Sequence, residues 1–196
     1  MKKGLILKSK KGMTLIELLV VLAIFFIMSA VTIFDYNSFK SNASLQNLSN
    51  EISLSIRKAQ TYAVGVGGIS GRFDEGYGVC FSKNEDYNKV FAIYSGDIDS
   101  FNEDYLSSDC EESSSSCMEI LSIKSDEEVT GFYVNDSLDE DIEFLNIYFL
   151  RPNPEAIFYS NQGEMSVQSI GVLITNAGTG KSKIIKVSNT GQISVE

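Results

Sequence analysis

The chain has 196 residues, 43% of them hydrophobic, and its 16 Lys and Arg against 26 Asp and Glu give a formal charge of -10. This length and apolar content suit one domain with an appendage, or two small domains, and exclude wholesale disorder. The chain has no histidine, which excludes Ser-His-Asp and Cys-His nucleophiles and histidine zinc motifs, and its three cysteines are too few for a four-cysteine zinc site. Carboxylate chemistry remains compatible with this composition, but we predict no catalytic residue and no cofactor.

The charge is unevenly distributed along the chain. Five lysines and no acid lie in residues 1–12, which leaves 11 basic against 26 acidic residues, a net charge of -15, for the remainder. A short basic start before an acidic body is typical of a targeting signal. The acidic body argues against general nucleic-acid binding, because that needs cations facing phosphates.

Residues 13–34 read MTLIELLVVLAIFFIMSAVTIF, an apolar run with a single charge at Glu17. As a helix this run is about 33 Å long, enough to span a bilayer core. The preceding lysines are expected to stay in the cytoplasm, so we predict a single pass of the cytoplasmic membrane with the C-terminal body outside. A plain anchor explains the length and the lysines but not Glu17. A secretory signal peptide would need a cleavage site of small residues after the apolar run, and this sequence has only a poor one, because Met28 is large where a small residue is needed.

The eleven residues from Lys11 to Val21, KGMTLIELLVV, resemble the class III signal of type IV pilins and type II secretion pseudopilins. This resemblance implies that residues 1–12 are a cytoplasmic leader, that prepilin peptidase cuts after Gly12, and that the new first residue, Met13, is methylated. The family usually has Phe there, so Met13 departs from the pattern. The resemblance also implies a subunit held in membrane lipid until an inner-membrane platform assembles it with other pilins into a pilus or pseudopilus.

Glu17 needs a partner on physical grounds as well. A carboxylate inside a bilayer costs roughly 2.5–3.5 kcal/mol on insertion scales. Cleavage after Gly12 creates an ammonium at Met13, four residues from Glu17 and on the same face of a helix. The family resemblance implies instead that the carboxylate takes the amine of a neighbouring subunit and so sets the register of assembly. The simplest alternative is that Glu17 has no function and that its carboxylate reaches the lipid headgroups at the membrane edge.

Residues 35–66 keep helical periodicity but become amphipathic, and a glycine-rich stop at 65–68 ends the pattern. We predict a continuous helix over 13–64, with 13–34 as its membrane and assembly half and 35–66 as its amphipathic half. The amphipathic half is expected to pack on a sheet through one apolar stripe, formed by Leu45, Leu48, Ile52, Ile56, Ala59 and Ala63.

Residues 67–196 change to period-two alternation and β-forming residues, and we predict an extracytoplasmic β-rich domain there. A hairpin turn is expected at Ser188-Asn189-Thr190-Gly191. A long helix followed by many short strands predicts an α+β fold, a type IV pilin-like antiparallel sheet packed on the helix. The expected strands are 77–82, 89–94, 120–124, 129–134, 142–150, 156–159, 170–175, 183–187 and 192–195.

Three segments, one at the end of the helix within 53–63 and two in the β-rich domain within 77–81 and 184–193, are similar to the GspH/FimT group of minor pilins and pseudopilins. The likeness implies a minor subunit rather than the main filament protein. Two alternatives stay open: a membrane-tethered binding module, and a DNA-uptake receptor pilin. The receptor would contact DNA through a small cationic cluster of Lys181, Lys183 and Lys186. Three lysines on so acidic a body are weak support, so DNA is not an expected partner.

The three cysteines suggest one disulfide. Cys110 and Cys117 bracket a polar stretch, and a disulfide between them is predicted if the body lies outside the cytoplasm, with two free thiols as the alternative. Cys80 lies in an apolar strand and is expected to be a buried thiol.

Two further motifs have residue types that are found in ligand sites. Asp97, Asp99 and Asp104 offer oxygen ligands for Ca²⁺, but their loop lacks the EF-hand glycine and spacing, so no metal site is predicted. Residues 176–182, NAGTGKS, resemble the end of a nucleotide-binding loop. Thr175 stands where that motif requires its first glycine, so we expect a hairpin loop here.

Overall fold

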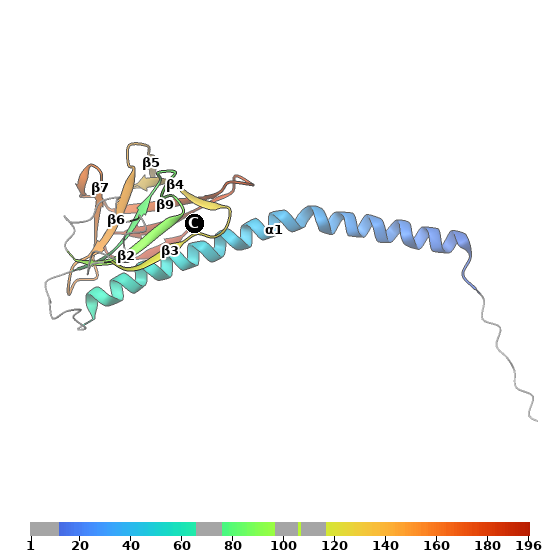
Figure 1. Ribbon diagram of the computed structural model, residues 1–196, viewed down its shortest axis with the longest axis horizontal. Coiled ribbons are helices and arrows are strands. Elements are labelled where there is room, and N and C mark those ends of the chain that lie inside the picture. Colours follow the sequence, from blue (N-terminus) through green and yellow to red (C-terminus); the bar gives the residue numbers. More distant parts are fainter. Residues whose placement is uncertain (1–11, 66–75, 97–105, 107–116) are drawn as a thin grey trace, which may run out of the picture. The chain divides into compact units, whose positions relative to one another are not determined.

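The computed structural model describes residues 12–65, 76–96, 106 and 117–196, without the side chains of 32–35 and 37–38. The chain divides into two compact units, Met1–Lys40 and Ser41–Glu196, and each is described by itself. The described residues form one helix, α1 (Leu15–Val64), and eleven strands (Figure 1).

The strands form two antiparallel sheets. The six-stranded sheet has the order β3-β2-β1-β6-β7-β8, and the five-stranded sheet has the order β11-β10-β9-β4-β5. The first comprises β1 (Gly76–Ser82), β2 (Val90–Gly96), β3 (Cys117–Ser122), β6 (Phe144–Phe149), β7 (Ala156–Ser160) and β8 (Gly163–Met165). The second comprises β4 (Glu127–Val134), β5 (Ser137–Asp139), β9 (Ser169–Asn176), β10 (Ser182–Ser188) and β11 (Ile193–Val195).

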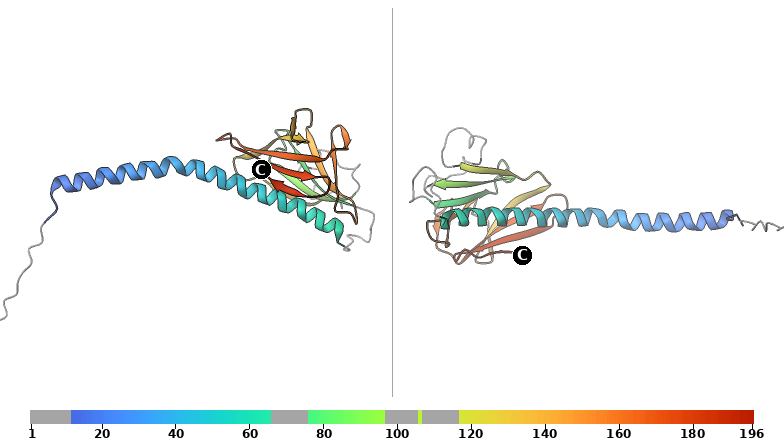
Figure 2. Two further views of the ribbon diagram at one scale, coloured as in Figure 1. Left: turned by 180° about the vertical axis from the view of Figure 1, so that it is seen from behind. Right: turned by 90° about the horizontal axis from the view of Figure 1, so that it is seen from below.

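The core of the second unit lies between both sheets and the last part of α1. All six residues of the predicted helical stripe are buried there. They pack with Val79 and Phe149 of the six-stranded sheet and with Phe132 and Val172 of the five-stranded sheet. In Figure 2, the strands lie to one side of the helix in the left-hand view and appear above and below it in the right-hand view, so the helix runs across the opening between the two sheets. Because burial of apolar surface drives folding, this shared core explains why the helix and the two sheets form one unit, and the predicted α+β fold is confirmed.

The other faces of the two sheets differ. On the six-stranded sheet, strand alternation turns Cys80, Tyr94 and Tyr148 away from the main core into a second buried cluster with Leu106. On the five-stranded sheet, the corresponding face keeps Leu138 exposed over 48% of its surface. The outer face of the five-stranded sheet is therefore the more accessible of the two.

Two short strands, β5 and β8, were not predicted from the sequence. Each has three residues, too few for an alternating pattern to be recognised. β5 follows a tight turn in which Asn135 and Asp136 both have positive φ, 47° and 72°. This geometry belongs to the mirror-image hairpin turns, which the sequence usually signals with Asn-Gly rather than Asn-Asp.

Candidate functional site

The start of α1 is fixed by a reciprocal pair of hydrogen bonds between Thr14 and Glu17. The Thr14 backbone N–H donates to Glu17 Oε2 at 2.9 Å, and the Thr14 hydroxyl donates to the same oxygen at 3.0 Å. In return, the Glu17 backbone N–H lies 3.3 Å from Thr14 Oγ1. This arrangement is a capping box, with Thr14 as the N-cap and Glu17 three residues later. It explains why the helix begins at Leu15 rather than at Met13.

Residues 12 and 13 lie before this cap. Gly12 is exposed, Met13 is 67% exposed, and neither is part of the helix. A Cβ atom added at Gly12 would meet nothing within 4 Å, so the described chain itself places no steric demand for glycine there. Any requirement for glycine at position 12 therefore comes from a molecule that approaches from outside.

Sequence reasoning gave Glu17 a partner but missed Thr14. The signal was present, because Thr-x-x-Glu before an apolar run is the pattern of a capping box. In this uncleaved chain the carboxylate accepts both hydrogen bonds from Thr14 and needs no second molecule. An ammonium at Met13, or one from a neighbour, would compete with bonds that already exist.

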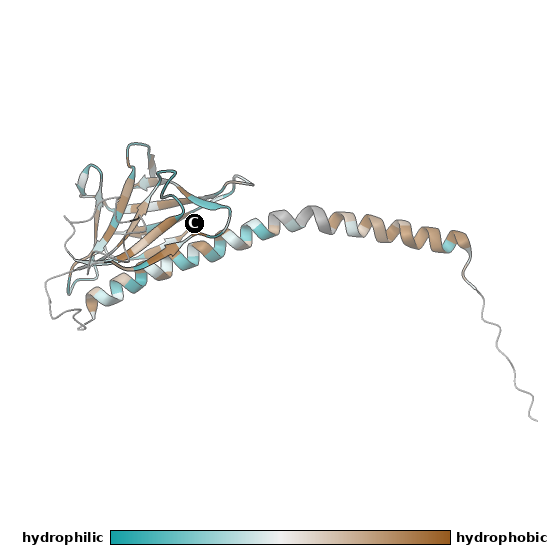
Figure 3. Cartoon of the chain, in the orientation of Figure 1, coloured by the Kyte–Doolittle hydropathy of each residue, from teal (hydrophilic) through white to brown (hydrophobic). Residues whose placement is uncertain are grey.

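The helix beyond the cap exposes apolar side chains. Large hydrophobic residues from Leu15 to Val31 are all at least 45% exposed, and Glu17 carries the only charge in this stretch. Figure 3 shows the contrast with the last part of α1, where polar and apolar residues alternate. An open groove of about 420 Å³ runs beside the cap, lined by Met13, Ile16, Glu17, Val20 and Val21. Over the part of the chain that the structure describes, no helix was found with the length and apolar character needed to cross a membrane.

The comparison with known families matches this segment. The prokaryotic N-terminal methylation motif covers residues 7–33. This motif is the N-terminal signal of type IV pilins and pseudopilins, so the likeness covers the first part of the chain. The motif implies processing by prepilin peptidase and membrane-anchored assembly with other pilins, and it marks a structural protein that is not an enzyme. No curated protein and no solved structure matches the chain.

The cysteines of this pilin-like protein lie partly outside the described residues. Cys117, at the start of β3, is disulfide-bonded, and its predicted partner, Cys110, lies outside the described residues. Cys80 is a buried thiol in β1 that takes no part in a disulfide. The pairing of Cys110 with Cys117 therefore stays a prediction.

The three lysines proposed for DNA contact do not share one surface. Lys183 lies opposite Ile174, which is buried in the core, whereas Lys186 lies opposite Gly171 on the outer face of the five-stranded sheet. Lys186 forms an ion pair with Asp136, and Lys181 donates to the side chain of Asn42 at 3.1 Å. Alternation along β10 separates the charges that the sequence placed together.

The calcium candidates Asp97, Asp99 and Asp104 lie outside the described residues. Among the residues that the structure describes, no group of acidic or cysteine side chains is arranged to hold a metal. The loop between β9 and β10 is a hairpin loop, as predicted. Its Thr179 meets Ser41 of α1, with 2.7 Å between their hydroxyl oxygens, so this loop contacts the helix.

Proposed function

We propose that this protein is a minor pilin or pseudopilin, most like the GspH/FimT group, and serves as a structural subunit of a type IV pilus or type II secretion pseudopilus. Prepilin peptidase removes residues 1–12 by cutting after Gly12, and Met13 is then methylated. The subunit waits in the cytoplasmic membrane as a single-pass protein, with its body outside, until the inner-membrane platform adds it to the filament.

One observation carries this proposal: the first half of α1 exposes apolar residues and begins two residues after the proposed cut. Exposure of such an apolar surface to water is unfavourable, so lipid or another protein has to bury it. Lipid covers residues 13–34 before assembly, and the helices of neighbouring subunits cover them afterwards. A helix with so little polar surface suits both environments, since van der Waals packing contributes to helix association in the absence of water.

The contacts of Glu17 support a role in the exchange between these environments. Its carboxylate is satisfied within its own chain by Thr14, which lowers the cost of placing it in lipid. Cleavage then supplies an ammonium at Met13, and incorporation supplies the ammonium of a neighbour. An ionic partner is stronger than a neutral one, so Glu17 exchanges partners as the subunit joins the filament.

Processing is tested by the N-terminal mass of the protein from cells with and without prepilin peptidase. We expect the mature chain to begin at methylated Met13 only when the peptidase is present. Gly12→Val should stay uncut, because the side chain obstructs the approach of the peptidase. Gly4→Val, in the same leader, is the matched control and should be cut normally. An intact Met1 terminus, in cells whose peptidase cuts another pilin, would contradict the proposal.

Assembly is tested with Glu17→Val. If the helix is only a tether for a binding module, the protein should tolerate or prefer this change, because a carboxylate leaves the membrane. If the proposal is correct, the variant should be cleaved and inserted but absent from sheared filaments.

The DNA-receptor alternative predicts salt-sensitive DNA binding that is lost when Lys181, Lys183 and Lys186 are changed. The separation of Lys183 and Lys186 on opposite faces of β10 gives that alternative no support.

A further inference from the structure

The outer face of the five-stranded sheet carries a bowl of about 150 Å³. Its floor is apolar and comes from three neighbouring strands. Tyr133 of β4 and Ile184 of β10 converge above Gly171 of β9, where an added Cβ would come within 2.7 Å of Ile184 and 3.2 Å of Tyr133. Residue 171 therefore has to lack a side chain for these two residues to meet and form the floor.

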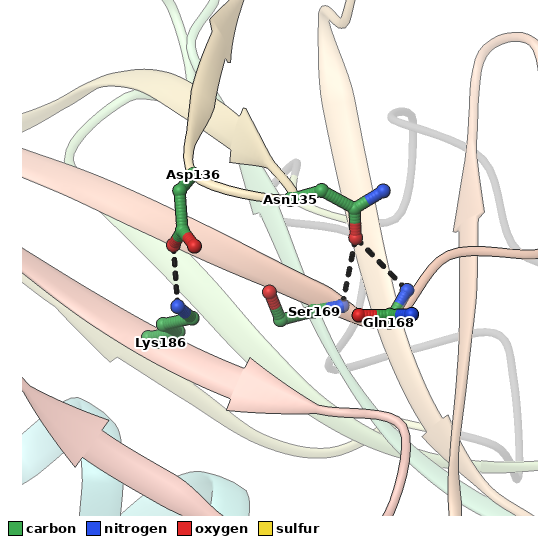
Figure 4. Close-up of polar contacts among 5 residues, drawn as sticks. All are labelled: Asn135, Asp136, Gln168, Ser169 and Lys186. Atoms are coloured by element: carbon green, nitrogen blue, oxygen red, sulfur yellow. Dashed lines mark hydrogen bonds and ion pairs between the residues drawn. The ribbon is translucent and has the colours of Figure 1, made fainter.

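The rim of the bowl is charged. It contains the carboxylates of Asp136 and Glu196 and the ammonium of Lys186, which is paired with Asp136 (Figure 4). The hydrogen bond to Asp136, together with the nearby charge of Glu196, raises the pKa of Lys186 and keeps it protonated. Two carboxylates against one ammonium leave the rim with one excess negative charge.

The position of Asp136 is fixed by its neighbour in the β4–β5 turn. Asn135 Oδ1 accepts hydrogen bonds from the backbone N–H groups of Gln168, at 2.9 Å, and Ser169, at 3.2 Å. Figure 4 shows these bonds tying the turn to the start of β9, with the Asp136 carboxylate directed toward Lys186. The turn that carries the Asp136 carboxylate is thus anchored to the backbone at the start of β9, which makes the site preorganised.

The size and polarity of the bowl select its ligand. It is smaller than the roughly 300–1,000 Å³ typical of small-molecule pockets, so it suits one side chain. An anion would meet two carboxylates, and a purely apolar side chain would bury charges without compensation. A lysine or arginine has an apolar stem that fits over Tyr133 and Ile184 and a cationic head that pairs with the excess negative charge, the Glu196 carboxylate left over once Lys186 pairs with Asp136.

We propose that this bowl is a docking point for a protein partner and accepts one lysine or arginine side chain of that partner. Leu138 lies opposite Tyr133 in the β4–β5 pair and is nearly half exposed, so the partner should present an apolar residue beside its cation. A second copy of this chain is a poor fit, because its residues after the leader carry a net charge of -15, from 11 basic and 26 acidic residues. This inference is independent of filament assembly.

The test uses the purified full-length protein in non-ionic detergent, with isoleucine methyl groups labelled for NMR. The probes are the N-acetyl amides of lysine, arginine and norleucine, the last having a similar stem without the charge. We expect the Ile184 methyl signals to shift and saturate with lysine and arginine amides in the millimolar range, and to respond at least threefold more weakly to norleucine amide.

Asp136→Asn provides the decisive variant. Asparagine tolerates positive φ, so the turn should be kept while the rim loses a carboxylate and leaves Lys186 without its ion pair. Binding of both cationic probes should weaken about three- to fivefold. Asp141→Asn changes an exposed carboxylate that does not line the bowl and should leave binding unchanged. Equal responses to norleucine and lysine amides, no response, or unweakened binding in Asp136→Asn would each overturn the proposal.

Discussion

Ser44 of α1 donates its hydroxyl to the carboxylate of Glu127 at the start of β4, across 3.0 Å. The carboxylate is completely buried, and its other oxygen accepts from the side chain of Asn176, at the end of β9, at 2.8 Å. The same Asn176 accepts a hydrogen bond from the backbone N–H of Thr179 at 2.9 Å and so shapes the β9–β10 loop. The Thr179 hydroxyl of this loop meets the hydroxyl of Ser41. One buried carboxylate therefore connects the helix, β4 and the β9–β10 loop.

This connection makes stability depend on pH. Burial by itself raises the pKa of Glu127, but hydrogen bonds from Ser125, Asn176 and Ser44 favour the charged form more strongly, so the pKa lies below the ordinary glutamate value. Because the folded state holds the proton less tightly than the unfolded state, this stabilisation is complete above the unfolded pKa, about 4.3, and is lost as pH falls through the folded value.

We expect Glu127→Gln to cost about 1–3 kcal/mol at pH 7 and to remove this contribution to the acid dependence. Thermal unfolding from pH 7 down to pH 3 measures both effects. Ser44→Ala removes one donor and keeps the charge, so it should reduce the acid dependence without abolishing it. A Glu127→Gln protein that melts lower at pH 7 but keeps the full wild-type decline in acid would contradict this account.

The turn between β10 and β11 gives a second prediction, which concerns Gly191. Gln60 of α1 donates to the backbone oxygens of Pro154 and Gly191, at 3.0 and 3.1 Å, and holds two loops against the helix. Gly191 has a φ of 79°, and an added Cβ would lie 2.2 Å from the Pro154 oxygen and 2.3 Å from Gln60 Nε2. Alanine would therefore be strained in its backbone and would also displace the contact.

Gly191→Ala should destabilise the protein by about 3 kcal/mol, which corresponds to a fall in melting temperature of roughly 6–12 °C. Gly180→Ala is the matched control, because its φ is also positive, at 68°, but an added Cβ would meet nothing within 4 Å. It should cost only the backbone strain, about 1–2 kcal/mol. Equal losses in the two variants would show that crowding at Gly191 is unimportant.

A feature could be predicted from the sequence where the residues that form it lie close together in the chain. The apolar stripe from Leu45 to Ala63 was predicted in full, because helical periodicity is local and appears in the sequence. The hairpin after β10 was predicted for the same reason. The contacts of Glu127 could not be predicted, because Asn176 and Ser44 are 49 and 83 residues away. Thr14 was a local signal that was overlooked beside the more prominent Glu17.

Asn146 gives a third prediction. It is completely buried in β6, between Cys80 of β1 and Tyr159 of β7, and in the part of the chain that the structure describes neither of its amide atoms has a hydrogen-bond partner. A buried polar group without a partner destabilises the folded state by about 1–3 kcal/mol. Leucine has a similar shape and no such penalty, so Asn146→Leu should raise the melting temperature.

Asn176→Leu is the contrasting variant. Asn176 is also buried, but its amide donates to Glu127 and accepts from Thr179. Its replacement should cost about 2–4 kcal/mol, because the buried carboxylate of Glu127 loses a donor. Thermal melting of both variants and the wild type tests this contrast. The melting temperature should rise in Asn146→Leu and fall in Asn176→Leu, although both replace asparagine by leucine. A loss of stability in Asn146→Leu similar to that in Asn176→Leu would contradict the unpartnered state of Asn146.

The last prediction concerns Thr14, whose hydroxyl both caps α1 and satisfies Glu17. Thr14→Val keeps the shape of the side chain but removes the hydroxyl, and loss of an N-cap costs about 1 kcal/mol. The first turn should then open about fivefold more often, which amide hydrogen exchange of the residues after 14 measures directly.

Thr14→Ser should behave like the wild type. Thr61→Val removes a hydroxyl that bonds Arg57 within the helix and should leave the first turn unchanged. Equal exchange in Thr14→Val and the wild type would mean that the helix starts without its cap, and that Glu17 is free to leave Thr14 at little cost when an ammonium arrives.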